Sequence, residues 1–177
     1  MKLPDFLDIA ARPPGLRCLI IGGYALAHHG HIRPTVDVDF LARRVDRPEW
    51  HARLAEAHMV LASGTSAFSQ FNPLGEGEGL DLMWVDDPTF DAMERAGGLA
   101  DFDGRPGRVV GLDHLLALKL HALRHASAER GSKDAADVEW LLRRHGISLD
   151  EGHYKDWFLR YGGASLHESF QRILRRP

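Results

Sequence analysis

The feature that most constrains this chain is an apolar strand that ends in a glycine pair and is followed, thirteen residues later, by two aspartates in alternate positions. The glycines are Gly22 and Gly23, and the aspartates are Asp37 and Asp39, within the predicted strand 36–43. Side chains at positions i and i+2 of a strand point to the same face. The two carboxylates are therefore expected side by side, which is unfavourable unless a cation lies between them.

A divalent metal ion is the cation that this pattern favours. Magnesium binds through one or two carboxylates together with substrate phosphates, so Mg²⁺ (or Mn²⁺) is the expected cofactor. Glycines at a strand-to-helix junction expose N–H groups and a helix N-terminus, which attract phosphate. The alternatives are a solvated edge strand for Asp37 and Asp39, and a tightly packed turn for Gly22 and Gly23. Apolar residues alternate with the two aspartates, which counts against a solvated strand.

The stretch GGYALAHHGHIRPTVDVDF, residues 22–40, resembles the nucleotidyltransferase superfamily typified by DNA polymerase β and kanamycin nucleotidyltransferase. The signature of that superfamily is a strand, a GG or GS pair, a short helix and a strand that carries DxD or DxE. The resemblance implies an α+β (α/β) fold, in which a small mixed or antiparallel sheet is flanked by helices. It also implies a third carboxylate on a later strand. Asp81 fits this role in the apolar run 80–85, where a buried charge needs a partner.

The resemblance covers about residues 18–145 and looks closest to the AbiEii-type toxin branch. In that branch, a lysine on one helix and a K/R-D-x-x-D motif on the next face the active site. The matching residues here are Lys119 and the motif that begins with Lys133 and Asp134. The resemblance therefore implies that these residues contribute to nucleotide binding.

The implied reaction is transfer of a nucleoside monophosphate from an NTP to an acceptor hydroxyl, with release of pyrophosphate. Asp37 and Asp39 would bind two metal ions, and Asp81 would complete the site of the ion on the nucleophile side. Two such ions clamp the attacking and leaving oxygens of an in-line displacement. Asp81 would also help to deprotonate the acceptor hydroxyl, and Gly22 and Gly23 would cradle the triphosphate.

The other candidate residues each have a plain structural alternative. Arg33 would hold a phosphate bidentately or form a surface salt bridge. Lys119 would contact a phosphate or one of the acids, or extend its ammonium group to solvent. Asp134 would belong to the site or simply stabilise the first turn of a helix. Asp137 is expected to pair with Lys133 at spacing i,i+4.

Length and composition are consistent with a small enzyme. A chain of 177 residues, 44 % of them hydrophobic, has room for a catalytic core at residues 1–110 and a helical part at residues 111–177 packed on it. The net charge of −3 gives no strong field for nucleic acid. Cys18 is expected to be a small buried apolar residue. No apolar run reaches membrane-spanning length and no signal-peptide pattern is present, so a cytoplasmic protein is expected. The eleven histidines show no zinc-binding spacing with a carboxylate.

The remaining elements follow from periodicity and turn residues. Strands are predicted at 17–22, 59–63, 66–71, 80–85, 99–103 and 107–110. Helices are predicted at 3–11, 23–30, 48–58, 88–96, 112–126, 133–145, 149–161 and 164–175, with Asp87 as the cap of the helix at 88–96 and residues 128–132 as a connection.

Three hypotheses on function remain. The first is transfer to RNA, with a tRNA 3′ end as acceptor and a cognate antitoxin as partner, as the AbiEii-type resemblance implies. The second is transfer to a small molecule, as in aminoglycoside resistance, or to a protein hydroxyl. The third is a descendant that binds nucleotide without catalysis. The sequence from Arg124 onward contains ten Lys and Arg residues and eight Asp and Glu residues. This positive surplus is smaller than a tRNA-binding surface usually needs.

Overall fold

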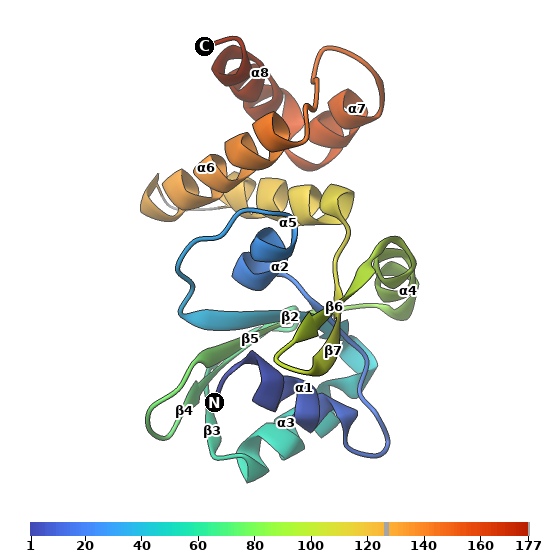
Figure 1. Cartoon of the computed structure of the whole chain (residues 1–177), viewed down its shortest axis with the longest axis vertical. Helices are drawn as coiled ribbons and strands as arrows, with labels where there is room; N and C mark the ends of the chain where they lie inside the picture. Colours follow the sequence, from blue (N-terminus) through green and yellow to red (C-terminus); the bar gives the residue numbers. More distant parts are fainter. Residues whose placement is uncertain (126–127, 177) are drawn as a thin grey trace. The chain divides into compact units, whose positions relative to one another are not determined.

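The computed structural model describes residues 1–125 and 128–176 (Figure 1). The chain divides into two compact units, Met1–Gly111 and Leu112–Pro177, and each is described by itself. Within the described part of the chain, no helix is both long enough and apolar enough to cross a membrane.

The first unit is built on a seven-stranded mixed sheet with the order β3-β4-β5-β2-β1-β7-β6. The pairs β2–β5 and β1–β7 are parallel, and the other four neighbouring pairs are antiparallel. This confirms the expected α+β architecture. The strands are β1 (Cys18–Ile20), β2 (Asp37–Arg43), β3 (Met59–Gly64), β4 (Phe68–Pro73), β5 (Gly79–Val85), β6 (Gly98–Phe102) and β7 (Arg105–Val109).

Helices cover both faces of this sheet (Figure 1). Helix α2 (Gly22–His28) lies on one face, and α1 (Leu3–Ala11) and α3 (Arg47–Glu56) lie on the other. A short 3₁₀ helix, η1 (Arg44–Asp46), leads into α3, and α4 (Asp87–Ala96) follows β5.

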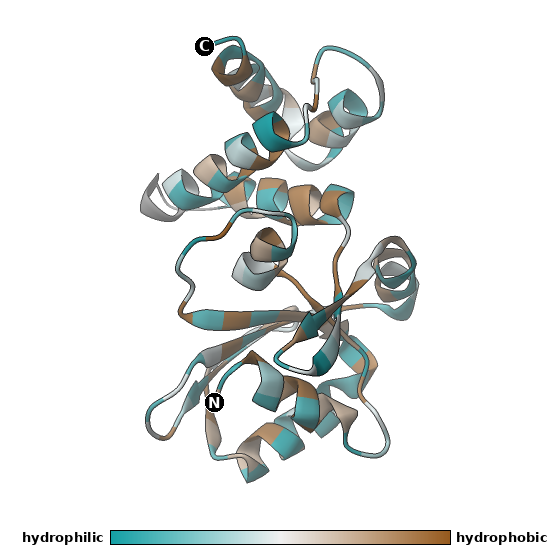
Figure 2. Ribbon diagram, viewed as in Figure 1, coloured by the Kyte–Doolittle hydropathy of each residue, from teal (hydrophilic) through white to brown (hydrophobic). Residues whose placement is uncertain are grey.

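Strand β2 shows why the sheet needs both layers. Its residues alternate between hydrophilic and hydrophobic over the first half of the strand (Figure 2). Val38 and Phe40 are completely buried, and the Phe40 ring packs against Trp50 of α3 with 6.0 Å between ring centroids. Because alternate residues face opposite ways, Asp37 and Asp39 belong to the face that α2 covers.

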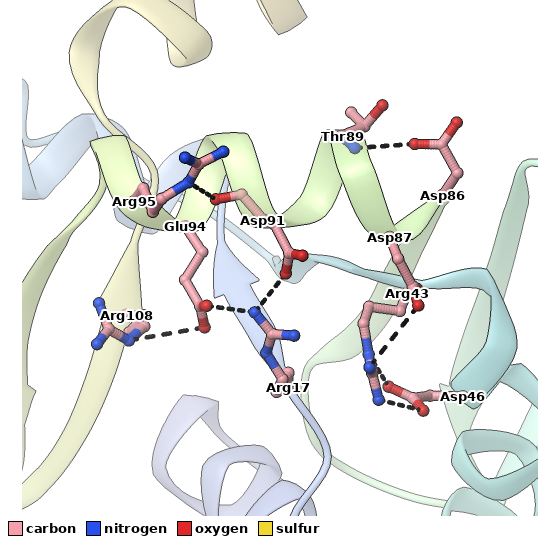
Figure 3. Close-up of polar contacts among 10 residues, drawn as sticks. All are labelled: Arg17, Arg43, Asp46, Asp86, Asp87, Thr89, Asp91, Glu94, Arg95 and Arg108. Carbon is pink, nitrogen blue, oxygen red and sulfur yellow. Dashed lines mark hydrogen bonds and ion pairs between the residues drawn. The ribbon is translucent and has the colours of Figure 1, made fainter.

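Helix α4 is tied to the sheet by arginines from three strands or strand ends (Figure 3). The guanidinium of Arg17 lies 2.6 Å from Asp91 Oδ1 and 2.5 Å from Glu94 Oε2, and these hydrogen bonds raise the pKa of Arg17. Arg108 of β7 approaches Glu94 at 3.7 Å. Arg43, at the end of β2, approaches Asp87 of α4 at 4.0 Å and donates two 2.8 Å hydrogen bonds to Asp46 of η1. Because these groups are partly exposed, each ion pair contributes only about 0–1 kcal/mol to the free energy of unfolding. The pairs therefore fix the position of α4 more than they stabilise the fold.

Arg53 joins α3 to the end of α1. Its side chain is 5 % exposed. It donates to the carbonyl oxygens of Ile9 (3.1 Å), Arg12 (2.8 Å) and Pro14 (2.7 Å), and to Glu49 Oε1 (2.7 Å). The last carbonyls of a helix have no partner within it, so Arg53 satisfies the C-terminal end of α1 in the core.

The second unit consists of α5 (Leu112–His125), α6 (Ala128–Arg144), α7 (Gly152–Tyr161) and α8 (Gly163–Leu174). Asp113 ties α5 to α7. Its carboxylate accepts from Tyr154 Oη (2.8 Å) and lies 2.9 Å from His153 Nε2, and its carbonyl accepts from Trp157 Nε1 (2.6 Å).

Several expected boundaries were wrong. The predicted connection at 128–132 is helical, because α6 begins at Ala128, and residue 126 lies outside the described residues. The cap of α4 is Asp86, whose side chain accepts from the Thr89 backbone N–H at 2.9 Å, and not Asp87. Strand β1 ends at Ile20, and helix α2 already begins at Gly22.

Candidate functional site

The three candidate acids lie on two adjacent parallel strands at the centre of the sheet. Strands β2 and β5 pair so that Asp39 stands opposite Asp81 and Asp37 stands opposite Gly79. Residues in register on neighbouring strands present their side chains to the same face. Asp37, Asp39 and Asp81 therefore belong to one face of the sheet. Asp81 is 8 % exposed, as the apolar run around it predicts.

Two glycines leave the space that the carboxylates of β2 occupy. A Cβ at Gly22 would lie 2.0 Å from Asp39 Oδ2, and a Cβ at Gly79 would lie 2.7 Å from Asp37 Oδ1. Gly22 also has φ +58°, a backbone conformation that residues other than glycine rarely adopt. The backbone N–H of Ile21 donates to the Asp39 carbonyl at 2.9 Å and fixes the entry into α2.

The second glycine of the pair has a different neighbour. A Cβ at Gly23 would lie 2.6 Å from Thr35 Oγ1. That hydroxyl donates to the Asp37 carbonyl at 3.2 Å. Thr35 thus sits between the glycine pair and the first aspartate. Gly22 and Gly23 are required by close packing, and the same packing brings backbone next to the acidic face.

A tyrosine from α2 holds the loop that leads into β5. Tyr24 Oη donates to Glu78 Oε1 at 2.9 Å. Burial and this hydrogen bond raise the pKa of Tyr24 to about 12. The backbone N–H of Glu78 also donates to the Met1 carbonyl at 2.9 Å. These contacts position the residue just before Gly79, and hence the approach to Asp37.

The donor chemistry fits a hard divalent cation, because the side chains on this face offer carboxylate oxygens. Within residues 1–125 and 128–176, no three His, Cys, Asp or Glu side chains already converge in a way that could hold a metal ion. Asp39 is packed against Gly22, and Asp37 is packed against Gly79. This packing holds both carboxylates in place, as ligands of such an ion would be.

The other candidates come from a loop of the first unit and from the helices of the second unit. Arg33 is in the loop before β2, where its Nη1 donates to the Pro34 carbonyl at 3.1 Å. In the second unit, Lys119 Nζ lies 2.6 Å from Asp134 Oδ1 and 2.7 Å from Asp137 Oδ2. The expectation that Asp137 pairs with Lys133 was wrong, because its ion pair is with Lys119. Lys133 is exposed.

The structure corrects two further expectations in this region. Lys119 is 8 % exposed and paired, so it does not extend to solvent. Asp134 lies inside α6 and not in its first turn, so a role as a terminal cap does not apply.

Sequence reasoning missed Thr35, Glu78 and Gly79 as parts of the site. A glycine directly before the predicted third-acid strand was the available signal for Gly79. Thr35 lies two residues before Asp37 in the motif itself. Nothing in the sequence connects Tyr24 to Glu78, because the contact depends on how the loop before β5 folds back onto α2.

No protein-family model and no curated protein sequence matches the chain. Solved structures do match. The antibiotic-resistance factor ANT(2″)-Ia, in complex with adenylyl-2″-tobramycin, has a TM-score of 0.61 at 16 % identity, over 95 % of this chain and 94 % of that one. The lincosamide antibiotic adenylyltransferase LnuA, with lincomycin bound, has a TM-score of 0.57 at 12 % identity, over 81 % and 94 %. A putative nucleotidyltransferase from Thermotoga maritima has a TM-score of 0.53 at 17 % identity, over 75 % and 94 %. The chain therefore has the nucleotidyltransferase fold.

Proposed function

We propose that this chain is a metal-dependent nucleotidyltransferase that moves a nucleoside monophosphate from an NTP to an acceptor hydroxyl and releases pyrophosphate. The observation that carries this proposal is the pairing of Asp39 with Asp81 across β2 and β5, with Asp39 packed on Gly22. A solvated edge strand would not account for it, because both strands lie at the centre of the sheet.

Each residue has a proposed task. Asp37, Asp39 and Asp81 would hold Mg²⁺ or Mn²⁺, and the bound metal would supply charge stabilisation at the reacting phosphate. Asp81 would accept the proton of the acceptor hydroxyl. The backbone N–H groups at Gly22 and Gly23, where α2 begins, would bind the triphosphate.

The remaining candidates are proposed to contribute to nucleotide binding. Arg33 offers a planar guanidinium that suits phosphate oxygens. Lys133 is exposed and would contact a phosphate directly. Lys119 already holds two aspartates, so its proposed task is to position Asp134. The resemblance to the AbiEii-type branch supports the assignments of Lys119, Lys133 and Asp134 in the second unit.

The acceptor is proposed to be a small hydroxylated molecule. One structural neighbour is a lincosamide antibiotic adenylyltransferase, and another, an antibiotic-resistance factor, was solved in complex with adenylyl-2″-tobramycin. The net charge of −3 also disfavours a polyanionic acceptor. RNA, with a tRNA 3′ end as acceptor and an antitoxin as partner, is the second candidate, and it rests on the GG-type motif and the Lys133-Asp134 motif.

One experiment tests the activity and separates the acceptors. Purified protein would be incubated with Mg²⁺ or Mn²⁺ and each labelled NTP in turn, with an aminoglycoside and lincosamide panel in one arm and total RNA in the other. We expect label on a small molecule with wild-type protein. Asp39→Asn should abolish transfer with an unchanged circular dichroism spectrum, and Asp156→Asn, an exposed carboxylate on α7, should retain it. Transfer by Asp39→Asn at the wild-type rate would remove the proposed site.

A further inference from the structure

The β3–β4 hairpin carries no charge at a place where the sheet is open. Residues 59–75 form a run of seventeen residues without Asp, Glu, Lys or Arg, although 27 % of the chain is charged. Strand β3 is an edge of the sheet (Figure 1), and residues 60–64 are all exposed. Val60 and Leu61 are each 45 % exposed. Consecutive residues point to opposite faces, so β3 offers apolar side chains on both faces of a strand whose outer edge is open.

The opposite edge of the same sheet is protected. Strand β6 carries Asp101, and its hairpin partner β7 carries Arg105, Pro106 and Arg108. Charged residues and proline are the usual means by which an edge strand avoids pairing with another chain. The edge strand β6 itself carries one charge, Asp101, whereas β3 carries none, so β3 is the less protected of the two edges.

The charges that flank β3 are arranged for pairing with a second copy. Helix α3 runs beside β3, so that Glu56 lies at the start of β3 and Arg47 lies at its end, where Arg47 Nη1 donates to the Thr65 carbonyl at 2.9 Å. In an antiparallel pair related by a two-fold axis, the start of one β3 meets the end of the other. Glu56 of each copy would then face Arg47 of the other copy, with opposite charges at both ends.

The shape of β3 also favours an identical partner. The ladder between β3 and β4 contains a bulge between Leu61 and Ser63. A bulge increases the local twist of a strand and restricts pairing at an edge, so only a partner strand that matches that twist can pair with β3. A second copy of β3 has the same bulge and the same twist.

We propose that two copies of this chain associate through antiparallel pairing of their β3 strands, with Val60 and Leu61 buried between them and Glu56–Arg47 pairs at both ends. The paired surface is small, and interfaces of that kind are weak. The association is independent of the proposed catalysis.

Sedimentation velocity from about 2 to 400 µM tests the proposal. The wild-type protein should change from the 19.8 kDa chain mass to twice that mass as the concentration rises. Leu61→Lys should raise the dissociation constant at least tenfold, because it places a charge on the open edge. Ser63→Lys serves as a second variant should the first lose its fold by circular dichroism. Leu99→Lys, the same change at a 67 % exposed position of β6, should leave association unchanged.

A charge exchange provides an independent test. Glu56→Arg should weaken association, and Glu56→Arg combined with Arg47→Glu should restore it. A wild-type protein that stays monomeric over the whole range would overturn the proposal, as would an unaltered constant for both lysine variants of β3. Loss of association in Leu99→Lys alone would assign the contact to β6 and would also overturn it.

Discussion

Replacing Lys119 by methionine would leave two aspartates of the helical unit side by side without the cation that they share. Lys119 Nζ lies 2.6 Å from Asp134 Oδ1 and 2.7 Å from Asp137 Oδ2. The side chains are 9 %, 15 % and 1 % exposed, respectively, so water cannot replace the ammonium group at Asp137. Methionine has a similar length and no charge, so the change removes the ion pairs with little change in volume.

The magnitude follows from burial. Breaking a buried pair by removal of one partner costs about 3–5 kcal/mol, because the remaining charge is left uncompensated. We expect a loss of about 3–5 kcal/mol for Lys119→Met. Domains are typically stable by about 5–15 kcal/mol, and the helical unit should therefore be close to unfolding in the variant.

Urea denaturation followed by circular dichroism measures the effect. Lys133→Met, an exposed lysine of the same unit, is the control and should stay within about 0.5 kcal/mol of wild type. Adding Asp137→Leu to Lys119→Met should recover about 2 kcal/mol or more, because it removes the buried charge. A loss below about 1 kcal/mol in Lys119→Met, or no recovery when Asp137→Leu is added, would refute the reasoning.

Three further predictions concern the first unit. Gly22→Ala should lower the free energy of unfolding by about 2–4 kcal/mol and reduce transfer at least tenfold in the labelled-NTP assay, because the added Cβ meets Asp39 Oδ2. The control Gly15→Ala, which has open space around it, should change neither the stability nor the transfer rate. Arg53→Leu should lower the free energy of unfolding by about 3–5 kcal/mol in urea titrations, since it leaves carbonyls of the α1 end without donors. Burial raises the pKa of Cys18 to about 12 from an ordinary value of 9.0. The thiol should therefore react at least tenfold more slowly with iodoacetamide at pH 8.5 than in urea, and its contribution to stability should be lost between pH 9 and 12, relative to Cys18→Ala.

Patterns with a local physical cause were predictable from the sequence. The alternation of aspartate and apolar residues predicted β2 and the face that carries Asp37 and Asp39, because strand periodicity follows from the backbone alone. The strands predicted at 99–103 and 107–110 form the β6–β7 hairpin, and the turn residues Asp103 and Gly104 both adopt positive φ. The position of Asp81 opposite Asp39 required the resemblance, because strand order is not local information.

Other features depended on competition between local and tertiary effects. Gly131 and Ser132 favour a loop by composition, yet α6 continues through them. A glycine costs a helix only about 1 kcal/mol, which burial of Val138, Leu141 and Leu142 outweighs. Asp137 pairs with Lys119 of α5 and not with Lys133, its neighbour at spacing i,i+4. A buried carboxylate gains more from a buried cation than from an exposed one. No single-sequence pattern shows which partner is buried.

The glycines and the aspartates of the candidate site are one structural unit. Gly22 and Gly79 come from different elements, yet each leaves room for one carboxylate of β2. Solvated carboxylates extend into water and do not occupy the space next to a glycine Cα. An alanine at either glycine position would displace Asp39 or Asp37, and the tight packing would serve no purpose for an exposed strand. The two aspartates are therefore best explained as groups held in a fixed place, as a cation-dependent reaction requires of the residues that bind its metal.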